Sequence, residues 1–367
     1  MRTVEELLFI TLRAGLGAEL SPGVEACADD ALWEQVINLA RKQGTLAICQ
    51  DGLVRLMNEG VDTGIGKQLR RSWFSRSVSY ERQYEKYTKV LSSLAGLYDK
   101  EGFKMMTMKG YGMSLLYPTP QHRPCGDIDI WLFGRQKKAD LMLRKKYSVG
   151  IDDSHHIHSV FKANGITIEN HYDFFNPYSY ASNRRVNELL TEMATVDQCG
   201  TLDLDGRTVY IPSADFNALY LVRHAAQHFA AIEITLRHLL DWGFFCKAHG
   251  SDVDWDRMLP LIESLNMDRF LHAIDAILVD YLGFSESCFP PIKRDYDLEA
   301  RVLESIIAPE YPDDAKPSRG LFRILIWKLR RWSSNLWKQR IVYNESPLRT
   351  FLSQILSHIL KPGTIKS

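Results

Sequence analysis

Residues 123–132 of the 367-residue chain read RPCGDIDIWL, and this stretch decides the expected fold class. Asp127 and Asp129 alternate with Ile128 and Ile130, which predicts a β-strand whose isoleucines enter a core. The two aspartates then share the opposite face, where like charges repel each other. A divalent cation held between them would explain the pair. Two solvent-facing charges on an edge strand, which protect sheets against aggregation, are the alternative.

A third carboxylate recurs in the same pattern. The stretch GITIENHY places two isoleucines on one face of an extended chain and Glu169 on the other. If this strand neighbours the first, Glu169 reaches the same point as Asp127 and Asp129. Three clustered anions without a cation would be strongly unfavourable because of repulsion and desolvation. An exposed strand face is again the alternative.

The stretch MKGYGMSLLY, residues 108–117, predicts a strand that ends at a glycine and opens a helix. Backbone N–H groups at such a helix N-terminus favour phosphate, and Lys109 adds a positive charge beside Gly110. The spacing is neither that of a P-loop nor that of a dinucleotide fingerprint. An ordinary turn also explains these glycines.

The pattern along the chain predicts helices, then mixed elements, then helices again. A long helical pattern ends at Gly102, and Asn-Gly and Asp-Gly turns near residues 164 and 205 predict two hairpins. Ser213 is a plausible N-cap where the helical pattern returns. We therefore expect an α+β fold with a small mixed β-sheet core over residues 98–212, flanked by helical regions over residues 1–97 and 213–367.

Composition indicates an ordinary globular protein. Lys plus Arg equals Asp plus Glu at 45 each, so overall charge gives no reason to expect a nucleic-acid partner. The six cysteines are scattered without paired spacing, which favours reduced thiols in a cytoplasmic protein over a disulfide scaffold or a structural zinc site. No apolar run is long enough to predict a transmembrane span.

Together these motifs resemble the nucleotidyltransferases of the DNA polymerase β superfamily. The shared order is a strand, a glycine turn, a helix, Asp-hydrophobic-Asp on the next strand and a later carboxylate. The likeness is closer to a poorly characterised bacterial family of nucleotidyltransferase-like proteins with a Lys-Gly, Tyr-Pro, Arg, Asp-x-Asp order, and it covers residues 98–245. One difference is Tyr111, which follows Gly110 where the superfamily usually has a small residue.

The resemblance implies transfer of a nucleoside monophosphate from a nucleoside triphosphate to a hydroxyl of a small molecule, sugar or protein. Pyrophosphate would leave, and two Mg²⁺ ions would assist. The residues implied for catalysis and metal binding are Asp127, Asp129 and Glu169, and those implied for nucleotide binding are Lys109, Gly110 and Arg123. A binding or regulatory module of the same fold without turnover is the alternative.

Histidines supply further candidates. A substrate contact is open for His155, His156, His158 and His171, which flank or lie on the predicted Asn-Gly hairpin. His224 and His228 are four residues apart on a predicted helix, which suits a metal, but no glutamate lies between them in the H-E-x-x-H manner. Packed helix histidines explain that pair better. Arg237 and Asp241 have the spacing of a helical ion pair. This pair and the two histidines could also line a cleft between the core and the C-terminal helical region.

Residues 319–342 are basic and aromatic, with seven Lys or Arg, three Trp and no acidic residue. Packing of the apolar side on the C-terminal helices is the preferred interpretation. Peripheral contact with an anionic membrane, or with nucleic acid, is the alternative.

Overall fold

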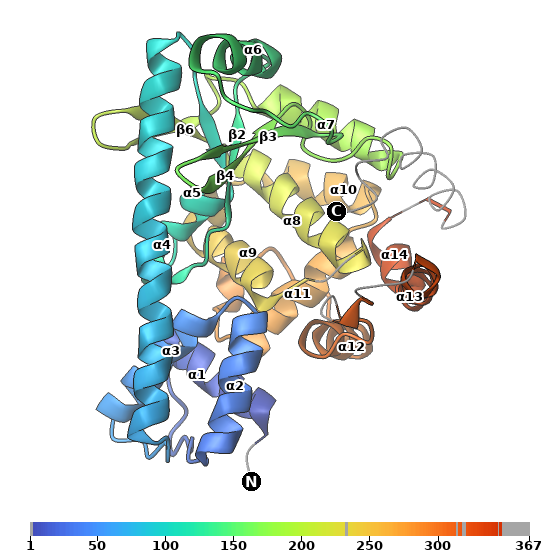
Figure 1. The fold of residues 1–367 in the computed structure, drawn as a ribbon. Coiled ribbons are helices and arrows are strands. Elements are labelled where there is room, and N and C mark those ends of the chain that lie inside the picture. Colours follow the sequence, from blue (N-terminus) through green and yellow to red (C-terminus); the bar gives the residue numbers. More distant parts are fainter. Residues whose placement is uncertain (1–2, 232–233, 313–314, 318–320, 344, 347–367) are drawn as a thin grey trace.

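The computed structural model describes residues 3–231, 234–312, 315–317, 321–343 and 345–346 (Figure 1). These residues form fourteen α-helices and a six-stranded mixed sheet, which confirms the predicted α+β fold with helical flanks. The helices are α1 (Val4–Gly15), α2 (Asp30–Lys42), α3 (Leu46–Asn58), α4 (Lys67–Lys100), α5 (Gly110–Ser114), α6 (Gln136–Tyr147), α7 (Ser182–Met193), α8 (Ala214–Ala231), α9 (Leu236–His249), α10 (Trp255–Ser264), α11 (Asp268–Asp280), α12 (Tyr296–Ile307), α13 (Leu321–Ser334) and α14 (Leu336–Val342). The strands are β1 (Met106–Met108), β2 (Asp127–Trp131), β3 (His158–Ala163), β4 (Ile166–His171), β5 (Gly200–Asp203) and β6 (Thr208–Ile211).

Helix α4 forms a column along one side of the molecule (Figure 1). Its buried residues recur every three or four positions, so one stripe of the helix faces protein along its length. Trp73 packs with the N-terminal helices, whereas Tyr87 and Leu91 pack on the sheet. Gly102 follows with φ of 72°, which ends the helix as the sequence predicted.

The sheet has the strand order β3-β4-β2-β1-β6-β5. Strands β1 and β2 are antiparallel, while β2 pairs with β4, and β1 with β6, in parallel. The β3–β4 and β5–β6 pairs are the two predicted hairpins. Their turns carry positive φ at Asn164 (49°) and Gly165 (77°), and at Asp205 (54°) and Gly206 (75°), as Asn-Gly and Asp-Gly turns require.

Strand β2 has two neighbours and therefore lies inside the sheet. The edge-strand explanation of its two aspartates is wrong, because β4 and β1 occupy both of its sides. Ile128 and Ile130 are fully buried in the cluster formed with α4 and α6, as predicted. Trp131, on the aspartate face, belongs to the larger cluster and stacks on Phe174 at 4.4 Å between ring centroids. The aspartate face of the sheet is thus covered by the C-terminal helices.

Helix α8 begins after Ser213, whose hydroxyl accepts a hydrogen bond from the Phe216 N–H at 3.3 Å, in agreement with the predicted cap. The basic segment 319–342 forms α13 and α14, apart from its first two residues, which lie outside the described part. Trp337 packs against Phe229 at 5.5 Å between ring centroids. No helix among the described residues is both long and apolar enough to cross a membrane.

Candidate active site

The three predicted carboxylates share one face of the sheet. Strands β2 and β4 run parallel, with Asp129 opposite Glu169 and Asp127 opposite Thr167. Because side chains alternate faces along a strand, Asp127, Asp129 and Glu169 point the same way. All three line one cavity of about 320 Å³ between the sheet and the C-terminal helices. Sequence alternation predicted the shared face, and the pairing of β2 with β4 brings the three carboxylates together.

Asp129 is buried at the floor of the cavity, with 3% of its surface exposed. His171 Nε2 lies 2.9 Å from Asp129 Oδ1, and the ammonium of Lys109 lies 3.6 Å from the same oxygen. Burial alone would raise the pKa of Asp129, but Lys109 and His171 hold it well below its ordinary value. Burial would likewise lower the pKa of His171, yet its bonds to Asp129 and Glu169 raise it to about 9. Asp129 and His171 therefore form an ion pair at neutral pH.

Asp127 differs from Asp129 because it is exposed at the mouth of the cavity. Partial desolvation raises its pKa, and the negative charges of Asp129 and Glu169 raise it further. Among the described residues, no cationic group lies within salt-bridge distance of its carboxylate. Lys109 and protonated His171 leave one of the three negative charges uncompensated. A cluster of oxygen ligands with an excess negative charge fits a hard divalent cation.

Glu169 completes the carboxylate group beside two histidines. Its Oε2 lies 3.3 Å from His158 Nδ1 and 3.5 Å from His171 Nε2. Burial lowers the pKa of His158 to about 4, so this ring is neutral while His171 is charged. Of the candidate hairpin histidines, these two reach the site. The His155 ring packs against the His158 ring at 4.8 Å between centroids, and His156 packs against Tyr178.

The glycine turn lies beside the carboxylates. Lys109 and Gly110 have φ of 44° and 23°, and a Cβ on Gly110 would approach Tyr87 Oη to 2.4 Å. Only glycine is accommodated here without displacing that ring. Tyr111 points away from the cavity and stacks on Tyr84 and Tyr87 at 5.8 and 6.5 Å between ring centroids. Its side chain therefore does not occupy the place where a phosphate would meet the turn.

Arg123 lines the cavity, but its charge is already paired. Its Nε and Nη2 donate to the two carboxylate oxygens of Asp241, each at 2.7 Å, and both side chains are buried. The hydroxyl of Tyr117 donates to the same carboxylate at 2.7 Å. The predicted Arg237–Asp241 helical pair is wrong, because Asp241 turns toward the segment that precedes β2.

Arg237 lines the cavity, as the sequence left open, although it was not among the residues predicted to bind nucleotide. Its Nη1 donates to the Pro124 carbonyl at 3.2 Å, while its buried Nε has no hydrogen-bond partner among the described residues. A buried guanidinium donor without an acceptor is costly unless an anion binds it. Its position in the first turn of α9, directly before His238, gave no sequence signal for this role.

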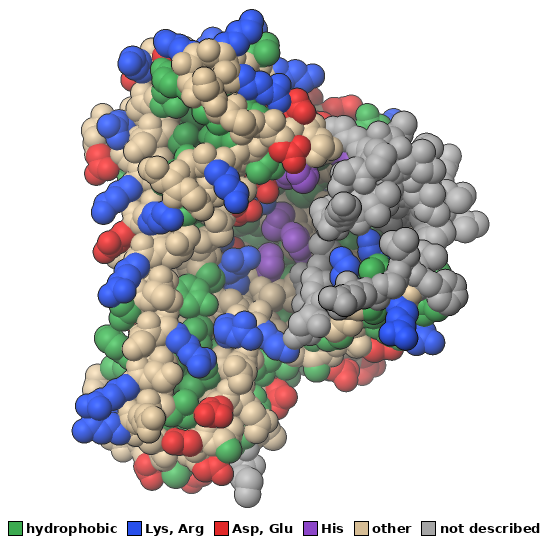
Figure 2. All heavy atoms as spheres, in the orientation of Figure 1, with side chains coloured by type: hydrophobic (Ala, Val, Ile, Leu, Met, Phe, Trp, Pro, Cys, Tyr) green, Lys and Arg blue, Asp and Glu red, His purple; other side chains and the backbone are tan. Residues whose placement is uncertain are grey.

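Three histidines lie on the same helical wall as Arg237. His224, His228 and His238 all line the cavity, and Figure 2 shows histidine side chains gathered in the central hollow of this face. Burial lowers the pKa of His224 and His238 well below the ordinary value, and the charges of Lys109 and Arg237 lower it further. The rings of His224 and His238 are therefore neutral at pH 7.

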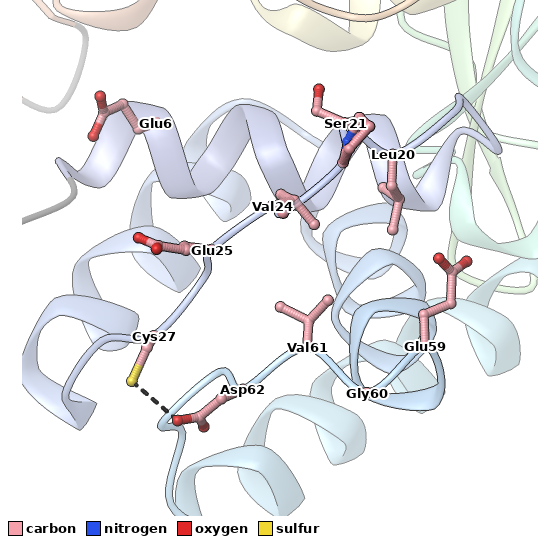
Figure 3. A pocket seen from close by; sticks show the side chains of 12 residues that line it. Glu6, Leu20, Ser21, Val24, Glu25, Cys27, Glu59, Gly60, Val61 and Asp62 are labelled. Atoms are coloured by element: carbon pink, nitrogen blue, oxygen red, sulfur yellow. Dashed lines mark hydrogen bonds between the residues drawn. The ribbon is translucent and has the colours of Figure 1, made fainter.

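A larger hollow, about 960 Å³, lies among the N-terminal helices (Figure 3). It is lined by apolar residues and by carboxylates such as Glu25 and Glu59, with no Lys or Arg among its lining residues. The Cys27 thiol donates to Asp62 at 3.5 Å. A wall of carboxylates without cations does not favour a phosphorylated ligand, so the smaller cavity is the better candidate site.

Comparison with known proteins agrees with this geometry. The model of a family described as uncharacterised nucleotidyltransferase matches residues 29–283. The chain belongs to this nucleotidyltransferase family. The predicted resemblance to nucleotidyltransferase-like proteins is thereby confirmed, and the family match extends into both helical flanks.

Other comparisons are sparse. No curated protein matches this nucleotidyltransferase-family chain. Among solved structures it is similar to an antigenic nucleotidyltransferase-like protein from Paracoccidioides brasiliensis, with 18% identity and a TM-score of 0.31. That similarity covers 44% of this chain and 75% of the other chain.

Proposed function

We propose that this protein transfers a nucleoside monophosphate from a nucleoside triphosphate to a hydroxyl-bearing acceptor, with release of pyrophosphate. The acceptor is a small molecule, a sugar or a protein. The observation that carries the proposal is the convergence of Asp127, Asp129 and Glu169 on one cavity that Lys109 and Arg237 also line. Membership of a nucleotidyltransferase family supports this class of reaction.

The carboxylates would hold two Mg²⁺ ions, with Asp127 and Asp129 as the main ligands and Glu169 as the third. When bound, the metal would neutralise charge on the phosphate oxygens and favour ionisation of the acceptor hydroxyl. Exposure of Asp127 at the cavity mouth gives a hydrated ion access to this group.

The basic side of the cavity would bind the triphosphate. Lys109 extends beside the glycine turn, and the unpaired Nε of Arg237 supplies a donor on the facing wall. The Gly110 backbone allows close approach of a phosphate, although α5 has only five residues and contributes little dipole. Arg123, predicted as a direct nucleotide ligand, would act mainly by fixing Asp241 and the segment before β2.

One observation favours the alternative, a binding or regulatory module without turnover. Asp129 is already neutralised by Lys109 and His171, and both cations compete with a metal for the same carboxylate. A module of this kind would bind a nucleotide without requiring Mg²⁺. The enzyme and the binding module therefore differ in whether nucleotide binding requires Mg²⁺.

Pyrophosphate release from each of the four ribonucleoside triphosphates, in the presence of Mg²⁺ and a metabolite pool, tests the enzyme proposal. We expect release with the wild type and its loss in Asp127→Asn. Asp203→Asn, on the exposed face of β5, is the matched control and should retain activity. Equal release by Asp127→Asn, or its absence from the wild type with every triphosphate, would contradict the proposal.

A further inference from the structure

Three histidines on the helical wall have no role in the proposed transfer. His224 and His228 lie one turn apart on α8, and His238 lies in the first turn of α9. Their ring centroids are 4.5 Å (His224–His228), 5.2 Å (His228–His238) and 5.7 Å (His224–His238) apart. One ring nitrogen from each lies within 4.8 Å of the other two. Three imidazoles thus converge on one point of the cavity wall.

We propose that His224, His228 and His238 bind a transition-metal ion of the Zn²⁺ type, with one coordination position open to the cavity. Two histidines four residues apart on one helix face form a natural chelate. A third from another helix completes a three-histidine set, which in zinc sites leaves the fourth position for water or a substrate atom. Imidazole selects Zn²⁺, Co²⁺ or Ni²⁺, whereas Mg²⁺ prefers the carboxylates of the opposite wall.

The geometry requires only side-chain movement. Tetrahedral Zn²⁺ with Zn–N bonds of about 2.1 Å separates ligand nitrogens by roughly 3.4 Å. The histidine nitrogens, at up to 4.8 Å, are therefore as much as about 1.4 Å too far apart, a gap that rotation of the rings can close. All three side chains are half-buried, so they have room to rotate toward one another.

A hydrogen bond can orient the His238 ring toward a metal. The Thr235 hydroxyl lies 2.9 Å from His238 Nδ1. If Nδ1 donates to this hydroxyl, Nε2 presents its lone pair to the metal, as in many metal sites. That tautomer gives up the 3.2 Å bond that the Thr235 N–H donates to the same nitrogen.

Local charge does not prevent binding. The cavity lining contains three cations and four carboxylates, so its side chains carry no excess of positive charge. Lys109 and Arg237 are the lining cations that oppose a metal at the histidines. An anionic group at the open position would offset that repulsion.

Co²⁺ is the probe for this site, because its visible absorption reports the ligands and geometry of the bound ion. We expect one equivalent of Co²⁺ to bind the full-length wild type with the spectrum of a four- or five-coordinate nitrogen site. An excess of Mg²⁺ should not displace it. His224→Gln and His238→Gln should each lose at least about tenfold in Co²⁺ affinity. His158→Gln, which alters the other histidine cluster, should bind Co²⁺ normally.

Absence of stoichiometric Co²⁺ binding by the wild type would overturn the proposal. Loss of the spectrum in His158→Gln with retention in His224→Gln would also overturn it, by moving the ion to the carboxylate side. Zn²⁺ should raise the thermal midpoint of the wild type but not that of His224→Gln or His238→Gln. Circular dichroism checks that both variants are folded. Asp127→Asn should keep Co²⁺ binding while losing turnover, so this site and the transfer reaction can fail independently.

Discussion

At the scale of single residues, the two aspartates of β2 have opposite electrostatic roles. Asp129 is stabilised as an anion by Lys109 and His171, whereas Asp127 is destabilised as an anion by its neighbours. A carboxylate with a raised pKa in the folded state disfavours folding while it is charged. Its neutralisation should therefore not harm the fold.

We predict that Asp127→Asn abolishes Mg²⁺-dependent turnover while leaving the thermal midpoint at pH 7 equal or higher. Asparagine keeps the shape of the side chain and removes the repulsion from Asp129 and Glu169. Differential scanning calorimetry measures the midpoint. A large loss of stability would instead show that Asp127 is a structural residue.

The His171–Asp129 pair predicts a pH dependence. The pKa of His171 rises from 6.5 to about 9 on folding, so its stabilisation is complete below pH 6.5 and is lost as the pH rises through 9. The shift corresponds to about 3 kcal/mol. His158 has its pKa lowered to about 4 and titrates below this window. We expect thermal midpoints of the wild type to fall between pH 6.5 and 9 more steeply than those of His171→Gln. Parallel profiles would show that His171 is neutral in the folded protein.

At the scale of elements, the turn between β1 and α5 depends on one glycine. We predict that Gly110→Ala destabilises the protein by about 1–2 kcal/mol, because an L-residue there is strained and its Cβ meets Tyr87 Oη. Gly112→Ala is the matched control, because a Cβ there would lie 4.0 Å from its nearest neighbour, Ile211 Cγ2. Chemical denaturation measures the free energy of unfolding of both variants. Adding Tyr87→Phe removes a buried hydroxyl that has no hydrogen-bond partner among the described residues, and should recover part of the lost stability.

The Arg123–Asp241 pair ties the segment before β2 to α9. Both side chains are at most 10% exposed, and removal of one partner leaves the other as a buried uncompensated charge. We expect Asp241→Asn to cost about 3–5 kcal/mol in unfolding free energy. The double variant Arg123→Met/Asp241→Leu should lose less unfolding free energy than Asp241→Asn. If Asp241→Asn had unchanged stability but weaker nucleotide binding, Arg123 would be a direct nucleotide ligand after all.

Sequence patterns predicted the features of the fold that depend on local periodicity and on turn residues. The alternation at Asp127–Trp131, the two glycine turns of the hairpins and the long helix α4 were all confirmed. Contacts that depend on tertiary packing were not predictable. Asp241 has a helical neighbour at the spacing of an ion pair, yet it binds Arg123, 118 residues away in sequence. His171 shares a strand face with Glu169, but only the parallel pairing of β2 and β4 brings it to Asp129.

At the scale of the whole molecule, the cavity exists because the sheet and the C-terminal helices pack together. One continuous hydrophobic cluster joins residues of the N-terminal helices, of the aspartate face of the sheet and of α8, α9 and α11. The sheet supplies the acidic floor and the helices supply Arg237 and the three histidines. The carboxylates of the sheet and Arg237 of α9 line the same cavity only because these two parts pack together.

The central claim is that the acidic floor binds Mg²⁺ together with a nucleoside triphosphate. Isothermal titration calorimetry of the four ribonucleoside triphosphates, with Mg²⁺ and with a chelator, tests it most directly. We predict binding of at least one triphosphate that requires Mg²⁺ and is lost in Asp129→Ala but kept in Asp203→Asn. Binding of equal strength with the chelator, or in Asp129→Ala, would contradict the claim.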